Sequence, residues 1–183
     1  YLVMVLDDLC ERYPIDGLHL DYVRFPNEPP GTPEGSGIDY PRDPATLWLY
    51  ARDTGRAPDD DRAAWDAWRT SRLTDLVRDL RSRLAASAPD VHLSAAVTPI
   101  LDRGREHFQD VSTWIAEGLI DTVFPMNYAA TRERFVERLQ PWTSMDVRVV
   151  MGVRAGIGGS AEERLEIALE RAVDRAPAAD EEQ

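Results

Sequence analysis

Apolar residues recur along this chain with two periods, one typical of helices and the other of buried strands. The helical period predicts helices over residues 2–12, 45–53, 61–87, 111–117, 131–139 and 160–173. Short apolar runs predict strands over residues 15–25, 91–97, 120–126 and 147–153. Each predicted strand is followed by a helix. This alternation is typical of a parallel sheet whose strands are buried on both faces.

Proline, glycine and capping residues set the boundaries of these elements. Pro14 ends the first helix, and Thr131 is a plausible N-cap of the helix that follows it. Residues 27–61, rich in proline and glycine at their start, are predicted to form a long loop insertion with one short helix. We expect residues 1–176 to form one domain and the acidic residues 177–183 to form a flexible tail.

The charge of the chain limits its partners. The net charge is −12, and all 21 basic residues are arginine. An acidic surface disfavours nucleic acid and anionic lipid, whereas a neutral sugar polymer meets no such penalty. No apolar run is long enough to span a membrane. We predict no cofactor and no metal site, because no phosphate-binding glycine motif follows a strand and the histidines lack partners at metal-ligand spacing.

The strand predicted over residues 15–25 carries the strongest candidate for chemistry. Strand alternation places Leu18, Leu20 and Tyr22 on one face, and His19, Asp21 and Val23 on the other. Asp21 would then point inward near the carboxyl end of a parallel strand, where barrel enzymes hold their active sites. His19 and Arg24 could support its carboxylate. The pattern alone fits a catalytic acid or a structural one equally well.

This strand also resembles a known family. Residues 16–26, Asp-Gly-Leu-His-Leu-Asp-Tyr-Val-Arg-Phe-Pro, are similar to the fourth-strand motif of glycosyl hydrolase-like family 10, bacterial proteins related to the α-amylase superfamily. Further segments resemble that family in the same order: residues 65–69, 93–97, 108–110 with Trp114, and 118–121 with 125–128.

The resemblance implies a partial (β/α)8 barrel whose four strands are the fourth to seventh of eight. It also implies an extracytoplasmic or secreted glycosidase with Asp21 as the nucleophile. His19 would match an arginine two residues before that nucleophile. We expect four parallel strands alone to be unstable or to associate, because two hydrophobic sheet edges would stay open without the missing barrel strands.

A retaining glycosidase needs a second carboxyl roughly 5 Å from the nucleophile. The amylase pattern places a glutamate at the end of the fifth strand, but residues 97–102 contain none. Asp102, Glu106 and Asp110 are the nearest acids. Each fits a surface or helix-capping position better than a catalytic one. Asp102 is the candidate acid and base.

Other polar and aromatic residues fall where a sugar could bind. Asn127 and Tyr128 end a strand, and Arg154 follows the next one. Tyr40 and Trp48 lie in the insertion and could stack on sugar rings, whereas Trp68 lies on an apolar helix stripe and fits the core better. The predicted sugar contacts are His19, Tyr22, Arg24, Tyr40, Trp48, Asn127, Tyr128 and Arg154.

Three functions remain open at this point. The chain could be a glycoside hydrolase acting on a polysaccharide or cell-wall glycan, which we favour. It could be a catalytically inactive carbohydrate-binding barrel, which fits the missing fifth-strand glutamate. It could also be a doubly wound domain of unrelated function, because fold and descent do not fix activity.

Overall fold

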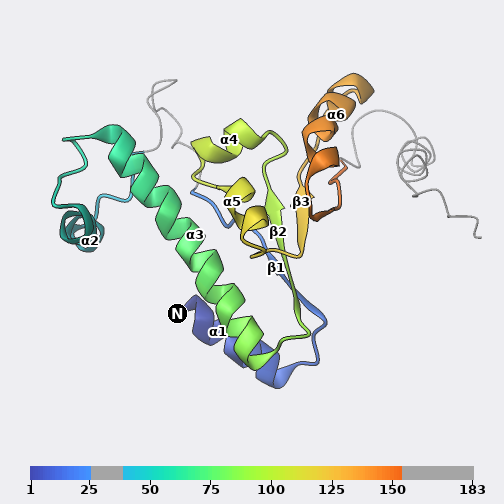
Figure 1. The fold of residues 1–183 in the computed structure, drawn as a ribbon, viewed down its shortest axis with the longest axis horizontal. Coiled ribbons are helices and arrows are strands. Elements are labelled where there is room, and N and C mark those ends of the chain that lie inside the picture. The colour runs from blue at the N-terminus through green and yellow to red at the C-terminus, as the bar shows by residue number, and fades with distance from the viewer. Residues whose placement is uncertain (26–38, 154–183) are drawn as a thin grey trace, which may run out of the picture.

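The structure, a computed structural model, describes residues 1–25 and 39–153. Four parallel strands form one sheet in the order β1-β2-β3-β4, with strand order equal to chain order. The strands are β1 (Gly17–Leu20), β2 (His92–Val97), β3 (Thr122–Pro125) and β4 (Arg148–Val149). The predicted mixed α/β architecture with parallel strands is therefore confirmed (Figure 1).

Helices connect these strands. They are α1 (Leu2–Arg12), α2 (Pro44–Thr54), α3 (Arg62–Ser87), α4 (Leu101–Glu106), α5 (Val111–Ala116), α6 (Arg132–Leu139) and the 3-10 helix η1 (Gln140–Ser144). The carboxylates of Asp43, Asp61 and Asp110 cap α2, α3 and α5, and the Thr131 hydroxyl caps α6 as predicted. None of the helices in the described ranges has the length and apolar character needed to cross a membrane.

Several boundaries differ from those predicted. The first strand ends at Leu20 instead of residue 25, because Tyr22 has a left-handed backbone with φ of 53° that breaks the extended conformation. The fourth strand is only two residues long. Helix α4 and η1 were not predicted, since both are too short to show a helical period. The helix predicted over residues 160–173 and the tail over 177–183 lie outside the described residues.

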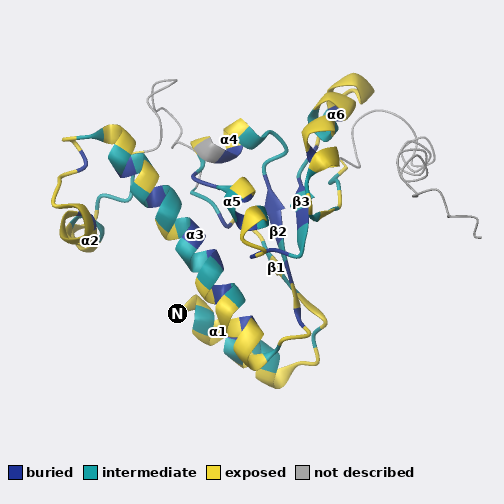
Figure 2. Cartoon of the chain, in the orientation of Figure 1, coloured by how far each residue is buried: buried dark blue, intermediate teal, exposed yellow. Residues whose placement is uncertain are grey.

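The two faces of the sheet differ in character. His19 pairs in register with Ser94, and Ser94 with Thr122, so these three side chains share one face. That face is more open, with His19 exposed and the other two half-buried. The opposite face packs on the helices and holds the core residues Leu93, Ala95, Val97 and Val123 (Figure 2).

The core lies between this second face and the helices α1, α3 and α5. Trp114 of α5 is fully buried there, and its indole N–H donates to the hydroxyl of Thr74 on α3 at 3.1 Å. Leu80 and Leu84 of α3 are also buried in this cluster. Burying side chains of this size stabilises the fold by about 1.5–3 kcal/mol each. The part of α3 from Leu73 to Leu84 is thus packed in the core beside the sheet.

A buried arginine joins the insertion to this core. The Arg69 side chain on α3 is fully buried, and its guanidinium lies 4.1 Å from the ring centroid of Phe108 and 4.9 Å from that of Trp65. It donates to the carboxylate of Asp66 and, at 2.8 Å, to the backbone carbonyl of Tyr40. Burial lowers the pKa of Arg69, and the bond to Asp66 opposes that shift. Arg69 therefore holds three separate segments in place.

The amino ends of the strands are held by a second charged contact. The carboxylate of Asp121 accepts from Arg81 of α3 at 2.8 Å and from the backbone N–H of Leu93 at 2.7 Å. Burial acts to raise the pKa of Asp121, but these hydrogen bonds outweigh it and lower the pKa overall. Helix α3 is thereby anchored to β2 and to the segment just before β3 at the end opposite to Asp21.

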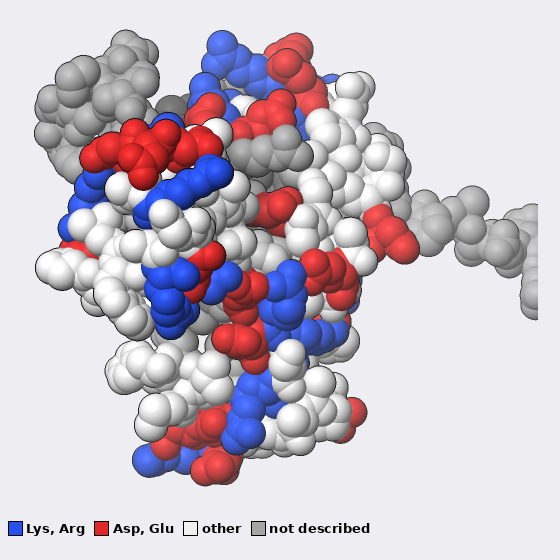
Figure 3. Space-filling view, turned by 60° about the vertical axis from the view of Figure 1, so that its left-hand side comes forward, with Lys and Arg blue, Asp and Glu red and all other residues white. Residues whose placement is uncertain are grey.

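Exposed charges on the helical side largely neutralise one another. Figure 3 shows acidic and basic side chains interleaved on this face. Arg62 pairs with Asp66 at 2.8 Å, and Arg78 pairs with Glu117 at 2.8 Å. Exposed pairs of this kind contribute little stability each, but they leave no extended surface of positive charge on the face shown.

Because Arg69 is buried among these contacts, we predict that its removal strongly destabilises the folded protein. Arg69→Ala deletes a fully buried side chain together with its contacts to Tyr40, Asp66 and the aromatic rings. We expect the free energy of unfolding to fall by about 3 kcal/mol or more. Urea denaturation of the variant and the parent protein measures this difference.

Arg72→Ala is the matched control. Arg72 lies one turn further along α3 with about half of its side chain exposed, and it pairs with Asp75 at 2.6 Å. Its removal should leave the urea midpoint nearly unchanged. An equal fall in the free energy of unfolding for the two variants would contradict the structural role assigned to Arg69.

Candidate active site

Asp21 is the first residue after β1, and its side chain is exposed. Its Oδ1 accepts a hydrogen bond from the backbone N–H of Tyr22 at 2.8 Å. This local bond orients the carboxylate, and among the described residues none is hydrogen-bonded to its Oδ2. Because parallel strands end at the same edge of a sheet, Asp21 lies at the edge where β2, β3 and β4 also end.

The residues after Asp21 do not follow the predicted alternation. Tyr22 is 74% exposed, whereas Val23 is 8% exposed and belongs to the core cluster that Leu18 and Leu20 pack against. The prediction that placed Val23 with His19, and Tyr22 with the leucines, is therefore wrong. The left-handed backbone at Tyr22 turns the chain, so the side chains of Tyr22 and Val23 lie on the opposite sides from those predicted. Tyr22 thus faces solvent beside Asp21.

His19 and Arg24, the two predicted supports of Asp21, make other contacts. Nδ1 of His19 lies 2.9 Å from the Ser94 hydroxyl, and its ring meets Phe124 edge-on at 5.0 Å between centroids. The guanidinium of Arg24 lies over the Tyr22 ring, 5.1 Å from its centroid. Within the described ranges, the hydrogen bond that holds Asp21 comes from the backbone of Tyr22.

Gln109, which sequence reasoning did not select as a site residue, joins the carboxyl ends of β1 and β2. Its side chain is 1% exposed. Its Nε2 donates to the carbonyl of Val23 at 3.1 Å and to that of Ala96 at 3.4 Å. Its Oε1 accepts from the backbone N–H of Thr98 at 3.2 Å. One amide thus satisfies buried backbone groups on two neighbouring strand ends.

Asn127 and Tyr128, which follow β3, have different environments. Asn127 is fully buried, and its Nδ2 donates to the carbonyl of Phe135 on α6 at 2.9 Å. Tyr128 is 52% exposed, and Gly152 lies so close that a Cβ there would sit 3.4 Å from its ring. Asn127 therefore links the strand end to α6, and Tyr128 is the residue that remains open to a ligand.

Of the three acids after β2, Asp110 caps a helix, and Asp102 and Glu106 line cavities beside helices. Both carboxylate oxygens of Asp110 are bonded to Thr113, the N–H at 3.2 Å and the hydroxyl at 2.7 Å. Asp102 is exposed in the first turn of α4 and lines a cavity of about 620 Å³ with Arg134 and Arg138 of α6. No contact joins Asp102 to Asp21 in the part of the chain that the structure describes. Its role as acid and base stays a prediction.

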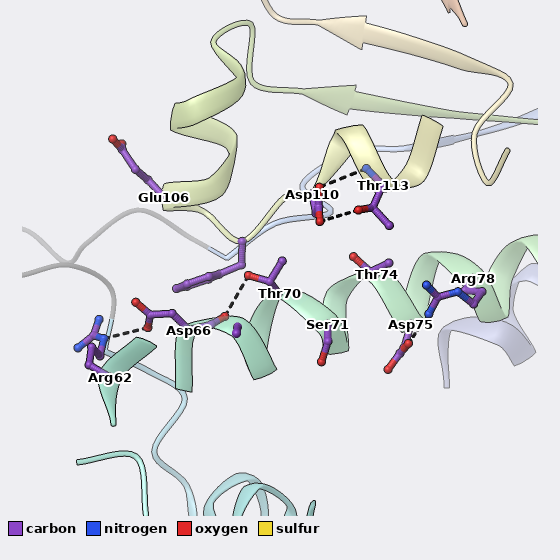
Figure 4. A pocket seen from close by; sticks show the side chains of 12 residues that line it. Arg62, Asp66, Thr70, Ser71, Thr74, Asp75, Arg78, Glu106, Asp110 and Thr113 are labelled. Atoms are coloured by element: carbon purple, nitrogen blue, oxygen red, sulfur yellow. Dashed lines mark hydrogen bonds and ion pairs between the residues drawn. The ribbon is translucent and has the colours of Figure 1, made fainter. Parts of the chain in front are cut away.

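Glu106 lies at a second cavity, of about 680 Å³, between α3 and the α4–α5 turn (Figure 4). Thr70 and Thr74 of α3 line one side of it, and Asp110 and Thr113 line the other. Glu106 and Asp110, two of the acids considered as partners of Asp21, line this cavity, whereas Asp21, Asp102 and the predicted sugar contacts do not. It lies in the helical layer, separate from the edge that carries Asp21.

The aromatic residues of the insertion divide into buried and exposed groups. Trp68 stacks on Trp65 at 5.3 Å between centroids, and its N–H donates to Asp53, which agrees with the packing role expected for it. Tyr40 is half-buried, with its ring 6.5 Å from that of Phe25. Trp48 on α2 is 62% exposed, and Arg52 lies over its ring at 5.3 Å. Arg154, also predicted to contact sugar, lies outside the described residues.

Comparison with known protein families gives a match over most of the chain. The sequence profile of the family described as Glycosyl hydrolase-like 10 matches residues 1–171, which is most of the chain and includes every strand of the sheet. No curated protein matches the chain closely enough to count as a relative.

The bridge made by Gln109 predicts a pH-dependent effect of a small substitution. In Gln109→Glu, an ionised carboxylate would face the carbonyls of Val23 and Ala96 without a proton to donate. We expect the free energy of unfolding to fall by about 3 kcal/mol near pH 7. The folded state raises the pKa of the new carboxyl, so this loss should shrink as pH falls toward about 5.

Gln140→Glu supplies the control, since Gln140 is exposed on η1. Urea denaturation at the two pH values measures both variants against the parent protein. If Gln109→Glu lowers the free energy of unfolding only slightly, or lowers it more as the pH falls, the amide does not bridge the strand ends.

Proposed function

The chain belongs to the glycosyl hydrolase-like 10 family, and from that membership we propose that it is a glycoside hydrolase with Asp21 as nucleophile. The substrate is a polysaccharide or cell-wall glycan. The observation that carries the proposal is the exposed carboxylate of Asp21, held by a backbone N–H at the carboxyl end of a parallel strand. Barrel enzymes place catalytic carboxylates at this end of their strands.

The fold is proposed to be part of a (β/α)8 barrel, with β1 to β4 as its fourth to seventh strands. The sheet order β1-β2-β3-β4 follows the chain without reversal. A barrel requires this order, whereas doubly wound sheets of unrelated function usually bind ligands at a point where the order reverses. The sequential order therefore favours the barrel over the doubly wound alternative.

The proposed reaction has two steps. Asp21 attacks the anomeric carbon and forms a glycosyl ester, while a second carboxyl gives its proton to the departing glycosidic oxygen. The same second carboxyl then takes a proton from water, which attacks the ester and releases the sugar and Asp21. Asp102 is the candidate for this second carboxyl among the described residues. In its present position it faces α6, so it would have to turn toward Asp21 in the complete site.

The side chains around Asp21 suit a neutral sugar. Tyr22 and Tyr128 are both exposed at this edge and offer aromatic faces and hydroxyl groups. Trp48 offers a further exposed ring on α2. The net charge of −12 disfavours phosphate polymers. The family likeness also suggests an extracytoplasmic or secreted enzyme.

A second candidate function is a catalytically inactive carbohydrate-binding barrel. The observation that favours it is the placement of the acids after β2. Asp110 caps α5 with both oxygens, and Asp102 and Glu106 line cavities of the helical layer. If no other carboxyl approaches Asp21 in the complete protein, the edge could bind a glycan without cleaving it.

Asp21→Asn in the intact protein tests the proposal. The amide keeps the shape of the side chain but is a poor nucleophile, so we expect the release of reducing ends from glycans to fall by at least about 10³-fold. The melting curve and glycan binding should remain close to those of the parent protein. A panel of neutral polysaccharides and cell-wall glycans provides the substrates.

Asp16→Asn is the matched control. Asp16 lies just before the same strand, at its amino end, and its side chain is also exposed. The substitution removes the same charge without touching the candidate site, so turnover should be retained. Full turnover by Asp21→Asn would overturn the nucleophile assignment. Binding without turnover by the parent protein on the whole panel would favour the inactive barrel.

A further inference from the structure

His19 and Ser94 form a hydrogen-bonded pair on the open face of the sheet, in register across β1 and β2. Nδ1 of His19 lies 2.9 Å from Oγ of Ser94. The same Oγ lies 3.2 Å from the backbone carbonyl of Leu18 and is placed to donate to it. Two hydrogen bonds therefore link Nδ1 of His19, Oγ of Ser94 and the carbonyl oxygen of Leu18. The protons available for them are the hydroxyl proton of Ser94 and, if it is present, a proton on Nδ1 of His19.

The number of available protons decides between two arrangements. If the Ser94 hydroxyl donates to the carbonyl of Leu18, which can only accept, then Nδ1–H of His19 donates to Oγ and both bonds are made. If the hydroxyl donates to Nδ1 instead, the bond to the carbonyl is lost. The first arrangement makes one more hydrogen bond and is favoured by about tenfold or more.

We infer that Ser94 is a positioning residue that holds neutral His19 as the Nδ1–H tautomer and so presents its Nε2 lone pair as a hydrogen-bond acceptor beside Asp21. The ring of Phe124, edge-on at 5.0 Å and 85°, restrains the same imidazole from β3. The tautomer and the orientation of the ring are thus both fixed by neighbouring strands.

This assignment changes the role that the family resemblance implied for His19. A ring that presents only a lone pair on Nε2 cannot donate to the carboxylate of Asp21. It also cannot take a proton from Ser94 through Nδ1, which is already protonated, so the pair is not a serine nucleophile with its base. His19 is instead available to accept a hydrogen bond from a ligand.

Two hydrogen-bond acceptors then lie at the carboxyl end of β1. His19 and Asp21 are two residues apart, which on an extended strand is about 7 Å between Cα atoms on one face. Nε2 of His19 and Oδ2 of Asp21 both accept hydrogen bonds, and hydroxyl groups of a sugar ring can donate to both. A carboxylate or sulfate on the sugar could donate to neither. The inference rests on the proposed function in naming a neutral, hydroxyl-bearing sugar unit as the ligand.

The tautomer can be measured directly, without substrate. The intact protein labelled with ¹⁵N-histidine is studied by long-range ¹H–¹⁵N correlation at about pH 8.5, where histidine side chains are in general neutral. The spectrum of His19→Gln identifies the signals of His19 by their loss. We expect the proton of His19 on Nδ1. A proton on Nε2 in the parent protein would overturn the inference.

Ser94→Ala removes the accepting hydroxyl, and we expect His19 to change to mainly the Nε2–H tautomer, which imidazoles in water prefer. Ser94→Thr keeps a hydroxyl on a strand-favouring residue and should restore the Nδ1–H signal. If Ser94→Ala leaves the tautomer unchanged while the other signals show a folded protein, Ser94 does not position His19.

The consequence for the ligand is tested in a separate measurement. Ser94→Ala should raise the KM for a cleaved neutral glycan by about tenfold, with a smaller change in kcat, and Ser94→Thr should restore it. An unchanged KM after a demonstrated tautomer change would overturn the ligand role of Nε2. Because the spectra need no turnover, they test Ser94 even if the proposed hydrolase activity itself is not found.

Discussion

The buried amide of Gln109 is the contact on which the candidate site depends most. The ends of parallel strands carry backbone groups that the sheet itself does not pair, and burying such groups unpaired is costly. Gln109 satisfies these groups at the carbonyls of Val23 and Ala96 and at the N–H of Thr98. The segment that carries Asp21 is thereby held next to the end of β2. The ends of β1 and β2 are joined by one side chain that is itself buried.

Arg69 extends this support to the insertion. Its guanidinium contacts the ring of Phe108, the residue before Gln109, and its donor groups hold the carbonyl of Tyr40. Residues that carry the family resemblance therefore divide into two sets. Trp65, Arg69, Gln109 and Trp114 are buried and build the scaffold, whereas His19, Asp21 and Tyr22 are exposed at the strand end. The second set is the one available for chemistry.

The sequence predicted the parallel α/β architecture and most of the helices from the regular spacing of apolar residues. That spacing is clearest in α3, where it extends over many turns. It could not predict the side-chain directions after Asp21, since a single left-handed residue at Tyr22 exchanges them. It also missed the bridging role of Gln109, which depends on contacts with residues 86 and 13 positions away in the chain. The pairing of His19 with Ser94 required the register of β1 and β2, which periodicity does not give.

The candidate site thus combines a fixed carboxylate, an imidazole held by a neighbouring strand and exposed aromatic rings, all at the carboxyl edge of a parallel sheet. We propose that Asp21 acts in this site as the nucleophile of a retaining glycosidase. An experimental structure of the intact protein tests it through the distance from the Asp21 carboxylate to the nearest second carboxyl at the same edge. For a retaining mechanism we expect about 5 Å, whereas a separation of roughly 6.5–9.5 Å, or no second carboxyl within that range, would rule out Asp21 as the nucleophile.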